Sequence, residues 1–557
     1  MQLNGSEIII ECLKEQGVDT VFGFPGGAVL NIYDALYKAR SSIRHILTSH
    51  EQGAAHAADG YARSTGKPAV VFATSGPGAT NLVTGLATAY MDSIPIIAFT
   101  GNVPTALLGR DSFQEVDITG ITLPITKHNY IVKDVTKLAD VIREAFYIAQ
   151  EGRPGPVLID VPKDVSAEIT TYEAKECVAY EPSKYKPQQK ALEKTLKLLK
   201  ESSKPMLYVG GGVVLSQAQQ ELAQFIENID APMGVSLMGY GTVDSAHRRF
   251  TGMIGMHGSR VSNIAVNNCD LLIVIGARFS DRVVSKASAF AKRARIVHID
   301  VDPAEINKNV VTYHHVIGDV KLVLSELNKM IKTPFVHEKW MNQIKGWKQE
   351  HPVRVAKETR RPFEILKALS HVMPEDGIMV TEVGQHQMWA AQFYRHTPAG
   401  RFLTSGGLGT MGYGTGSAIG AQVACPHKRV VNVAGDGSFK MNCNELATIA
   451  RYGFPVVILL MNNQTLGMVR QWQTLFYENR YSETTLDTHI DWVALAKAYG
   501  IEGMRLTLDD DPEAVLSAAF ALNKAVVIDC EVPKDDKVYP MVAPGASIEE
   551  MIDEPLG

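Results

Sequence analysis

Short runs of apolar, mostly β-branched residues recur along the whole chain, and each ends at glycine, proline or a polar turn. None alternates apolar with polar positions, which is typical of strands buried on both faces of a parallel sheet. Helical stretches such as 53–63 and 444–452 separate the runs. This alternation predicts an α/β fold built from doubly wound parallel-sheet domains. The runs are 70–74, 96–100, 157–161, 206–209, 271–275, 296–301, 430–434, 456–461 and 526–530.

Two polar stretches without strand runs, 163–189 and 332–361, are predicted as linkers. They divide the chain into blocks 1–165, 190–335 and 360–540, followed by a tail, 541–557. Val161-Pro162-Lys163-Asp164 closes the first block, and Val532-Pro533-Lys534-Asp535 closes the third. This repeat predicts two related α/β domains that flank a different one.

Composition excludes several classes of protein. The 557 residues carry 55 Lys+Arg against 60 Asp+Glu, a net charge of −5, so no basic surface for nucleic acid is expected. No apolar run approaches the roughly 20 residues of a membrane span, and the N-terminus lacks a secretory pattern. The six cysteines are scattered without a CxxC pair, which argues against a clustered zinc site. We expect a cytoplasmic protein with reduced thiols.

The third block holds the sharpest chemical signal. The run 430–434 leads into Gly435-Asp436-Gly437-Ser438, and the next run leads into Asn462-Asn463. A strand–helix–strand unit of this length places Asp436 and Asn463 at the carboxyl edge of one sheet, where ligands bind. A carboxylate and an amide oxygen suit Mg²⁺ bound to a diphosphate, and the glycines let the backbone approach phosphate. The alternative is two unrelated turns.

In the first block, Glu51 opens a helix of small residues after a short strand. Taken alone, it is an acid favoured by the positive end of the helix dipole. Beside a diphosphate–Mg²⁺ site in a related domain it suggests thiamine diphosphate, which needs a carboxylate at its pyrimidine ring.

Six motifs across residues 1–555 resemble the thiamine-diphosphate-dependent carboligases, and most closely the catalytic subunits of the acetohydroxyacid synthase (acetolactate synthase) family. They are Phe24-Pro25-Gly26-Gly27-Ala28, the run 50–63, Ser75-Gly76-Pro77-Gly78-Ala79-Thr80-Asn81, Asp111-Ser112-Phe113-Gln114-Glu115, Gly384-Gln385-His386-Gln387-Met388-Trp389 and Leu466-Gly467-Met468-Val469-Arg470-Gln471-Trp472. The resemblance implies three doubly wound domains, which bind the thiamine pyrimidine, FAD and the thiamine diphosphate group in chain order.

The resemblance implies an enzyme that decarboxylates pyruvate and ligates the two-carbon unit to a second pyruvate or to 2-ketobutyrate. This is the first common step of branched-chain amino acid biosynthesis. Glu51 would hydrogen-bond the pyrimidine, Met411 would bend the cofactor, and Gly27 and Gln114 would lie near the reacting carbon. Mg²⁺ would be held by Asp436, Asn463 and the carbonyl of Thr465. The cofactor pocket would comprise Val383, Gly384, Gln385, His386, Gly409, Met411, Gly435, Asp436, Gly437, Ser438, Asn463, Thr465, Leu466, Gly467 and Met468.

Substrate choice is expected from Arg282 and Trp472, together with Phe113 and Lys163. A guanidinium can hold the carboxylate of the second keto acid at two points, and an indole face can favour a longer alkyl tail. We therefore expect 2-ketobutyrate to be the preferred acceptor. The alternatives are an ordinary surface ion pair for Arg282 and a helix-packing aromatic for Trp472.

The middle block resembles the family's FAD site, with Gly210-Gly211-Gly212 between a strand and a helix. A tight turn would also explain three glycines. The implied FAD residues are Arg153, Gly210, Gly211, Gly212, Ser236, Leu237, Met256, His257, Gly276, Arg278, Asp300, Asp302, Gly318 and Asp319.

Three positions depart from the family pattern: Thr415-Gly416 replace a common Leu-Pro, Thr465 a frequent His, and Ser280 a common Asp. The first is expected to loosen the helix start near Met411. Rival functions are a pyruvate oxidase using FAD, a 2-keto acid decarboxylase, and a non-catalytic nucleotide-binding protein. The resemblance implies a homodimer or homotetramer, and it leaves open whether a small regulatory subunit binds.

Overall fold

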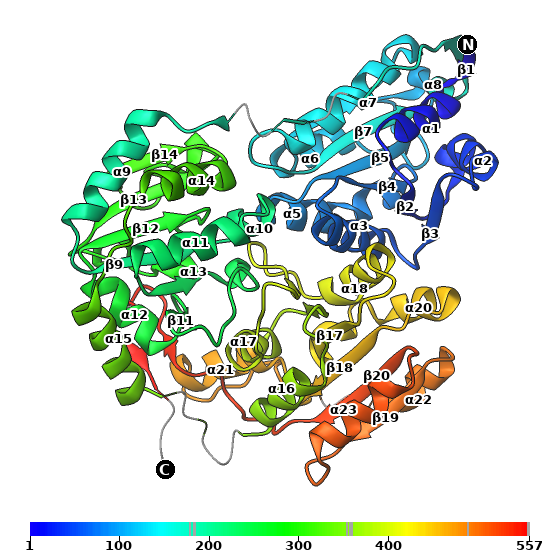
Figure 1. Cartoon of the computed structure of the whole chain (residues 1–557). Coiled ribbons are helices and arrows are strands. Elements are labelled where there is room, and N and C mark those ends of the chain that lie inside the picture. The colour runs from blue at the N-terminus through cyan, green and yellow to red at the C-terminus, as the bar shows by residue number, and fades with distance from the viewer. Residues whose placement is uncertain (178–179, 182–184, 353–354, 356–359, 487–489, 554–557) are drawn as a thin grey trace.

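Three six-stranded sheets organise the chain, one in each predicted block (Figure 1). The computed structural model describes residues 1–177, 180–181, 185–352, 355, 360–486 and 490–553. Within each sheet all neighbouring strands are parallel, and helices cover both faces, which confirms the predicted α/β class. All nine predicted runs lie in strands of these sheets.

The first and third sheets share one topology. Numbered by their order within each domain, their strands run 2-1-3-4-6-5 in both, so the repeat at 161 and 532 marks the sixth strand of each. The first sheet is β3 (Arg44–Leu47), β2 (Thr20–Gly23), β4 (Ala69–Ala73), β5 (Ile96–Asn102), β7 (Val157–Pro162) and β6 (His128–Ile131). The third is β16 (Arg401–Leu403), β15 (Ile378–Thr381), β17 (Val430–Gly435), β18 (Val457–Asn462), β20 (Val526–Glu531) and β19 (Glu502–Leu506).

The middle sheet differs, with its strands in the order 3-2-1-4-5-6, the order of dinucleotide-binding sheets. The two related domains therefore flank a different one, as predicted from the repeat. The middle strands are β11 (Phe250–Met253), β10 (Met233–Val235), β9 (Pro205–Val209), β12 (Leu271–Ile275), β13 (Arg295–Asp300) and β14 (His314–Ile317).

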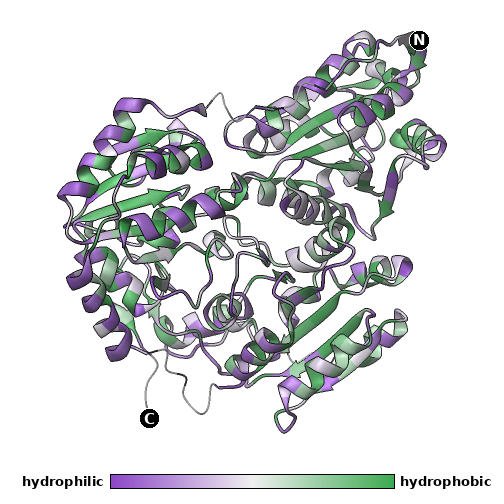
Figure 2. Ribbon diagram, viewed as in Figure 1, coloured by the Kyte–Doolittle hydropathy of each residue, from purple (hydrophilic) through white to green (hydrophobic). Residues whose placement is uncertain are grey.

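Amphipathic helices cover the sheets, and Figure 2 shows hydrophobic strands beneath helices whose outer faces are hydrophilic. The first domain has α1 (Gly5–Glu15), α2 (Leu30–Lys38), α3 (Glu51–Thr65), α4 (Pro77–Asn81), α5 (Val83–Asp92), α6 (Ile118–Thr122) and α7 (Val135–Gln150). The middle domain has α9 (Gln189–Glu201), α10 (Gly212–Leu215), α11 (Gln219–Ile229), α12 (Arg260–Asn268), α13 (Asp281–Val284) and α14 (Val320–Met330). The third has α16 (Arg361–Val372), α17 (Gln385–Phe393), α18 (Tyr413–Ala424), α19 (Asp436–Phe439), α20 (Leu446–Tyr452), α21 (Gly467–Phe476), α22 (Trp492–Ala498) and α23 (Pro512–Ala521).

Both predicted linkers contain folded structure, which corrects the sequence prediction. The first contributes α8 (Lys163–Ala167) and β8 (Ile169–Thr171), and β8 pairs with β1 (Gln2–Asn4), so it belongs to the first domain. The second contains α15 (Glu338–Glu350), which buries Trp340 against the middle domain. Residues 178–179, 182–184, 353–354 and 356–359 of these linkers, and 554–557 of the tail, lie outside the described residues.

Helices α3 and α18 join the first domain to the third (Figure 1). Their backbones touch because the contact positions are small: a Cβ at Gly60 would lie 2.1 Å from the Ser417 carbonyl oxygen, and one at Gly420 would lie 1.8 Å from that of Ala57. A buried polar network reinforces the contact, since Arg63 binds both Asp59 and Asp92. Tyr413 donates to Asp59 at 2.7 Å. The two domains are thus fixed relative to each other within one chain.

None of the described helices is long and apolar enough to cross a membrane. All six cysteines are unpaired in the structure.

Candidate active site

Asp436 and Asn463 meet at the carboxyl edge of the third sheet. Asp436 opens α19 directly after β17, Asn463 follows the adjacent strand β18, and the backbone N–H of Asn463 donates to the Asp436 carboxylate. Asp436 is 4% exposed, and its Oδ1 has no hydrogen-bond partner among the described residues. Burial raises the pKa of Asp436 to about 6. A buried, half-unsatisfied carboxylate is costly unless a cation completes it.

The amide and the third predicted ligand complete a donor set suited to a hard cation. The Thr465 N–H donates to Asn463 Oδ1 at 3.1 Å, and Thr465 is buried with its hydroxyl unpartnered among the described residues. No group of three His, Cys, Asp or Glu residues within the described part of the chain could hold a metal. The donors here are instead one carboxylate, one amide and a backbone carbonyl, which fit Mg²⁺ with a diphosphate and water as its remaining ligands.

Two predicted cofactor residues on α17 differ in their surroundings. The His386 ring packs against the loop 435–438, the predicted diphosphate loop, since a Cβ at Gly435 would lie 2.6 Å from its Nδ1. Its Nε2 is buried without a described partner, and burial lowers the pKa of His386 to about 3. Gln385 is committed to protein contacts: its Oε1 accepts from Asn463 Nδ2 at 3.3 Å and its Nε2 donates to the Asp536 carbonyl at 2.8 Å. Gln385 therefore positions Asn463.

Glu51 lies at the matching edge of the first sheet, at the start of α3. Its side chain is 8% exposed, and Oε2 accepts a hydrogen bond from Asn81 Nδ2 at 2.9 Å. A Cβ at Gly78 would lie 3.1 Å from Oε1, so the glycine leaves space beside the carboxylate. The loop before Glu51 is held by the third domain, where buried Glu445 accepts from the Ser49 and His50 amides at 3.1 Å.

The other predicted residues of the first domain surround this edge. Gly27 follows β2, Lys163 follows β7, and both are exposed. Gln114 is half-buried with φ 57°, beside Gly76, where a Cβ would lie 2.8 Å from the Gln114 carbonyl. Phe113 is 88% exposed. Of these four residues, only Gln114 is partly buried.

A cavity of about 1780 Å³ between the domains is lined by residues of three predicted sites, those for thiamine diphosphate, substrate and FAD. Its thiamine-site lining is Val383, Gly384, Gly409, Met411 and Met468, and its substrate lining is Arg282 and Trp472. From the FAD prediction it contains Arg153, Gly211, Gly212, Ser236, Leu237, Met256, His257, Gly276, Arg278, Asp300 and Asp319. The cavity lining includes neither Glu51, Gly27, Gln114, Phe113 and Lys163 nor Asp436 and Asn463.

Arg282 and Trp472 come together across the middle and third domains. The guanidinium carbon lies 5.9 Å from the indole centroid, and Nη1 lies 3.6 Å from Met256 Sδ. Arg282 is 61% exposed, and its only described carboxylate neighbour, Asp281, is 3.8 Å away. The guanidinium is thus oriented by the indole and keeps its hydrogen-bonding edge available for an anion.

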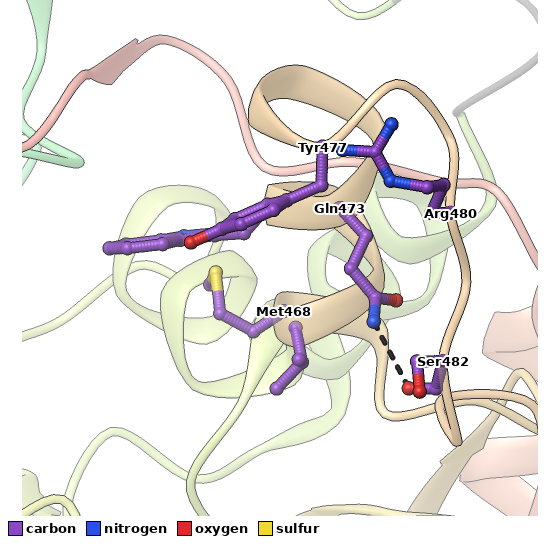
Figure 3. Close-up of a pocket in the computed structure, with 7 residues that line it drawn as sticks. Met468, Gln473, Tyr477, Arg480 and Ser482 are labelled. Carbon is purple, nitrogen blue, oxygen red and sulfur yellow. Dashed lines mark hydrogen bonds between the residues drawn. The ribbon is translucent and has the colours of Figure 1, made fainter.

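A second pocket, of about 610 Å³, adjoins Trp472 on the outer side of α21. Figure 3 shows Met468, Gln473, Tyr477, Arg480 and Ser482 around it. Gln473 donates to the Ser482 carbonyl at 3.0 Å, which ties the helix to the segment after it. Val469 and Trp472 complete the lining, so a largely apolar space continues from the indole.

Close packing between two loops also explains the glycines of the middle domain, in addition to the predicted binding of FAD. A Cβ at Gly210 would lie 2.4 Å from the Gly276 carbonyl oxygen, and one at Gly212 would lie 2.7 Å from the Gly276 Cα. Two strand-end loops therefore touch here. Arg153 forms an ion pair with Glu305 at 2.8 Å and lies 3.5 Å from Asp302. The Asp302 carboxylate accepts a hydrogen bond from the Ala304 N–H, which caps a short 3₁₀ helix, so this carboxylate already has a protein partner.

The departure at Thr415-Gly416 lies at the start of α18. Helix α18 begins at Tyr413, and the Thr415 N–H donates to the buried carboxylate of Glu382 at 3.1 Å, so its start is held. Sequence reasoning missed Glu382, Glu445 and the Glu51 partner Asn81. Asn81 closes one of the quoted motifs, whereas nothing local distinguished the two glutamates.

Comparison with known proteins agrees with this arrangement. Residues 3–121, 192–327 and 382–530 match the N-terminal TPP binding, central and C-terminal TPP binding domains of thiamine pyrophosphate enzymes. The chain is 46% identical to the acetolactate synthase large subunit of Cyanidium caldarium, over 98% of this chain and 96% of that protein. The chain belongs to the acetolactate synthase large-subunit family of thiamine pyrophosphate enzymes.

Bacterial members of the acetolactate synthase family are equally similar. Identity is 44% to the acetolactate synthase isozyme 2 large subunit of Escherichia coli (strain K12), over 99% of this chain and 100% of that protein. It is 45% to the acetolactate synthase of Mycobacterium bovis, over 99% of this chain and 91% of that protein. Each of the three matched thiamine enzyme domains contains one of the three parallel sheets or the larger part of it.

Proposed function

We propose that the chain is an acetolactate synthase, which decarboxylates pyruvate and ligates the resulting two-carbon unit to a second 2-keto acid. The observation that carries the proposal is the pairing of Glu51 and Asp436–Asn463 at equivalent edges of two sister sheets, in a chain of this family. A non-catalytic relative would have no use for two buried carboxylates at these edges.

The residues fit thiamine diphosphate and Mg²⁺. Asp436, Asn463 and the Thr465 carbonyl would hold the ion, and the backbone of Gly435–Ser438 would meet the diphosphate. Bound thiamine diphosphate supplies a carbanion and an electron sink for decarboxylation. Glu51 would hold a proton against the pyrimidine, with Asn81 fixing one carboxylate oxygen. Met411 and Val383, in the cavity wall, would shape the cofactor, and the buried setting excludes water.

FAD is proposed for the middle domain. The support is its dinucleotide-type strand order and the large cavity lined by Gly211, Gly212, Arg278 and Asp300. Arg153 and Asp302 already bind protein partners, so they would shape this site through Glu305 and the 3₁₀ helix at Pro303–Glu305. FAD would be structural, because the proposed overall reaction transfers no electrons.

Arg282 would bind the carboxylate of the acceptor, and Trp472 would contact its alkyl tail. One methylene in an apolar pocket is worth about 1–3 kcal/mol, so the indole face would favour 2-ketobutyrate over pyruvate. The pocket in Figure 3 continues the apolar surface beyond the indole.

Replacement of Trp472 by leucine is therefore expected to lower the preference for 2-ketobutyrate by roughly 5–100-fold. Total turnover of pyruvate should change far less, since the proposed role of Trp472 concerns only the alkyl tail of the acceptor. The two products are measured in one reaction containing both keto acids. Trp347→Leu, the same change at a half-buried position of α15 that lines neither pocket, is the control. An unchanged product ratio would disprove the role of Trp472.

We further propose a homodimer in which Glu51 of one chain serves Asp436 of the other. Within one chain the large cavity omits both residues, and two apolar side chains of the first domain are exposed, Phe113 at 88% and Leu30, just after β2, at 56%. Two copies in a closed dimer would cover this face.

Mixing Glu51→Gln and Asp436→Ala variants tests this arrangement. Each alone should be inactive, but a mixed dimer would have one site with both residues intact, which restores roughly a quarter of wild-type activity after random reassociation. If each site used residues of one chain only, every mixture would remain inactive.

A homotetramer, a small regulatory subunit and a cytoplasmic location stay predictions. Two relatives are named large subunits, which suggests a smaller partner. A pull-down with the full chain would test for this second subunit.

The experiment that tests the proposed function is a reaction with pyruvate and 2-ketobutyrate, from which thiamine diphosphate, Mg²⁺ and FAD are each omitted in turn. We expect acetohydroxybutyrate to exceed acetolactate, with formation of both products dependent on all three additions. Acetaldehyde as the main product would favour a decarboxylase, and peroxide with acetyl phosphate would favour a pyruvate oxidase.

A further inference from the structure

We propose that Glu382 is a positioning residue that fixes the relative places of the three segments expected to hold thiamine diphosphate. This inference rests on the proposed function. Glu382 lies at the end of β15, immediately before Val383, and is absent from the cavity wall.

The two carboxylate oxygens join separate parts of the third domain. Oε2 accepts from Ser438 Oγ at 2.7 Å and from the Gly412 N–H at 2.8 Å, and Oε1 accepts from the Thr415 N–H at 3.1 Å. Ser438 belongs to the diphosphate loop, and Gly412 follows Met411. One side chain thus connects the segments 383–386, 409–412 and 435–438.

The surrounding residues are shaped for this carboxylate. Gly412 has φ 86°, a left-handed conformation open to glycine, and its carbonyl accepts from Asn442 Nδ2 at 2.7 Å. A Cβ at Gly414 would lie 3.0 Å from the Glu382 side chain and 2.4 Å from Asn432 Oδ1. Glycine is therefore needed where α18 begins against Glu382.

Burying an ionised carboxylate at this position costs free energy, and this cost argues for a specific role of Glu382. Glu382 is 0% exposed, burial raises its pKa, and no described lysine or arginine forms an ion pair with it. The hydrogen bonds and the positive end of the α18 dipole offset part of this cost. Glutamine cannot replace it, because its amide nitrogen would face an N–H or O–H donor instead of accepting from it.

The test measures the affinity of the metal-supplemented apoenzyme for thiamine diphosphate, by titration with Mg²⁺ present. Glu382→Gln is expected to weaken binding roughly 10–100-fold, because charge-assisted hydrogen bonds to both loops are lost. Glu382→Asp, which keeps the charge but is one methylene shorter, should lie between Glu382→Gln and wild type. It is the variant used if Glu382→Gln does not fold.

The matched control is Glu15→Gln. Glu15 is a partly buried glutamate that also accepts from several donors, the Lys175 N–H and its ion-pair partner Arg143 among them, but it lies in the first domain away from the site. It should lower the Tm and leave the affinity for thiamine diphosphate within twofold of wild type. Ser438→Ala, which removes one of the donors, should combine less than additively with Glu382→Gln.

Three outcomes are distinguishable. Weaker binding by Glu382→Gln and unchanged binding by Glu15→Gln would support the positioning role. A lowered Tm with affinity within twofold of wild type would overturn it, because Glu382 would then only stabilise the fold. If the wild-type protein itself failed to bind thiamine diphosphate, the proposed function would fall, and this inference with it.

Discussion

Replacement of Glu51 by glutamine is expected to lower kcat roughly 10²–10⁴-fold, the range that a positioned proton-transfer group contributes. Glutamine keeps the size of the side chain and its hydrogen bond from Asn81, so the fold and the α3–α18 contact should be unaffected. The affinity for thiamine diphosphate should change little, because the diphosphate end is held by the third domain.

The sharpest measurement is the exchange of the thiazolium C2 proton of bound thiamine diphosphate with deuterium, followed by NMR after acid quench. Exchange should slow with kcat in Glu51→Gln and stay at the wild-type rate in Glu11→Gln, an exposed change on α1. Exchange at the wild-type rate in Glu51→Gln would contradict the assignment of Glu51.

Replacement of Asp436 by asparagine should have opposite effects with and without metal. In the metal-free protein Asp436 is a buried carboxylate with an unpartnered Oδ1 and a pKa of about 6. A neutral asparagine removes that cost, so the free energy of unfolding at pH 7 should rise, by at most about 3 kcal/mol. With Mg²⁺ and thiamine diphosphate the wild type should gain stability, and the variant should gain little and be inactive.

The effect of this substitution on stability should also depend on pH. Because the folded-state pKa is raised from an ordinary 3.8 to about 6, the stability contributed by this group is present below pH 4 and is lost as the pH rises through 6. Wild type and Asp436→Asn without metal should therefore be equally stable near pH 4 and differ at pH 7. Denaturant unfolding at both pH values measures this. A variant less stable than wild type at pH 7 without metal would contradict it.

Nine of the twelve interior strands could be predicted from the sequence, because parallel strands covered on both faces read as unbroken apolar runs. The interior strands β2, β10 and β15 were not predicted, since each has only three or four residues. None of the six outer strands was predicted. Five of them, β3, β6, β14, β16 and β19, carry histidine, arginine or glutamate at exposed positions, and each has only three to five residues. These strands form because they pair with a neighbouring strand, and the local sequence pattern carries no information about that partner.

The helix α15, inside the second predicted linker, was missed for a different reason. Trp340, Ile344 and Trp347 stand at helical spacing, so the amphipathic helix α15 could have been identified behind its charged residues. For the first linker, the short strand β8 pairs with β1, about 165 residues earlier, and only tertiary structure shows this.

The candidate site divides in the same way. Asp436, Asn463 and Glu51 were found because turn chemistry and spacing mark the ends of strands. Glu382, Glu445 and the Arg63–Asp92 pair were not, because their partners lie about 30 to 400 residues away. A buried carboxylate that accepts hydrogen bonds from distant loops leaves no local sequence motif. Its role is visible only from its hydrogen bonds in the structure.

The central claim is that this chain joins two keto acids at a site formed by Glu51 and the Asp436–Asn463 pair. Its most direct measurement is the product formed from ¹³C-labelled pyruvate in air, with thiamine diphosphate, Mg²⁺ and FAD, identified by NMR. We expect labelled acetolactate and carbon dioxide in a 1:1 ratio from two pyruvates, without peroxide, and product formation roughly 10²–10⁴-fold slower in Glu51→Gln. Acetaldehyde or acetyl phosphate as the main product, or acetolactate formed equally well by Glu51→Gln, would contradict it.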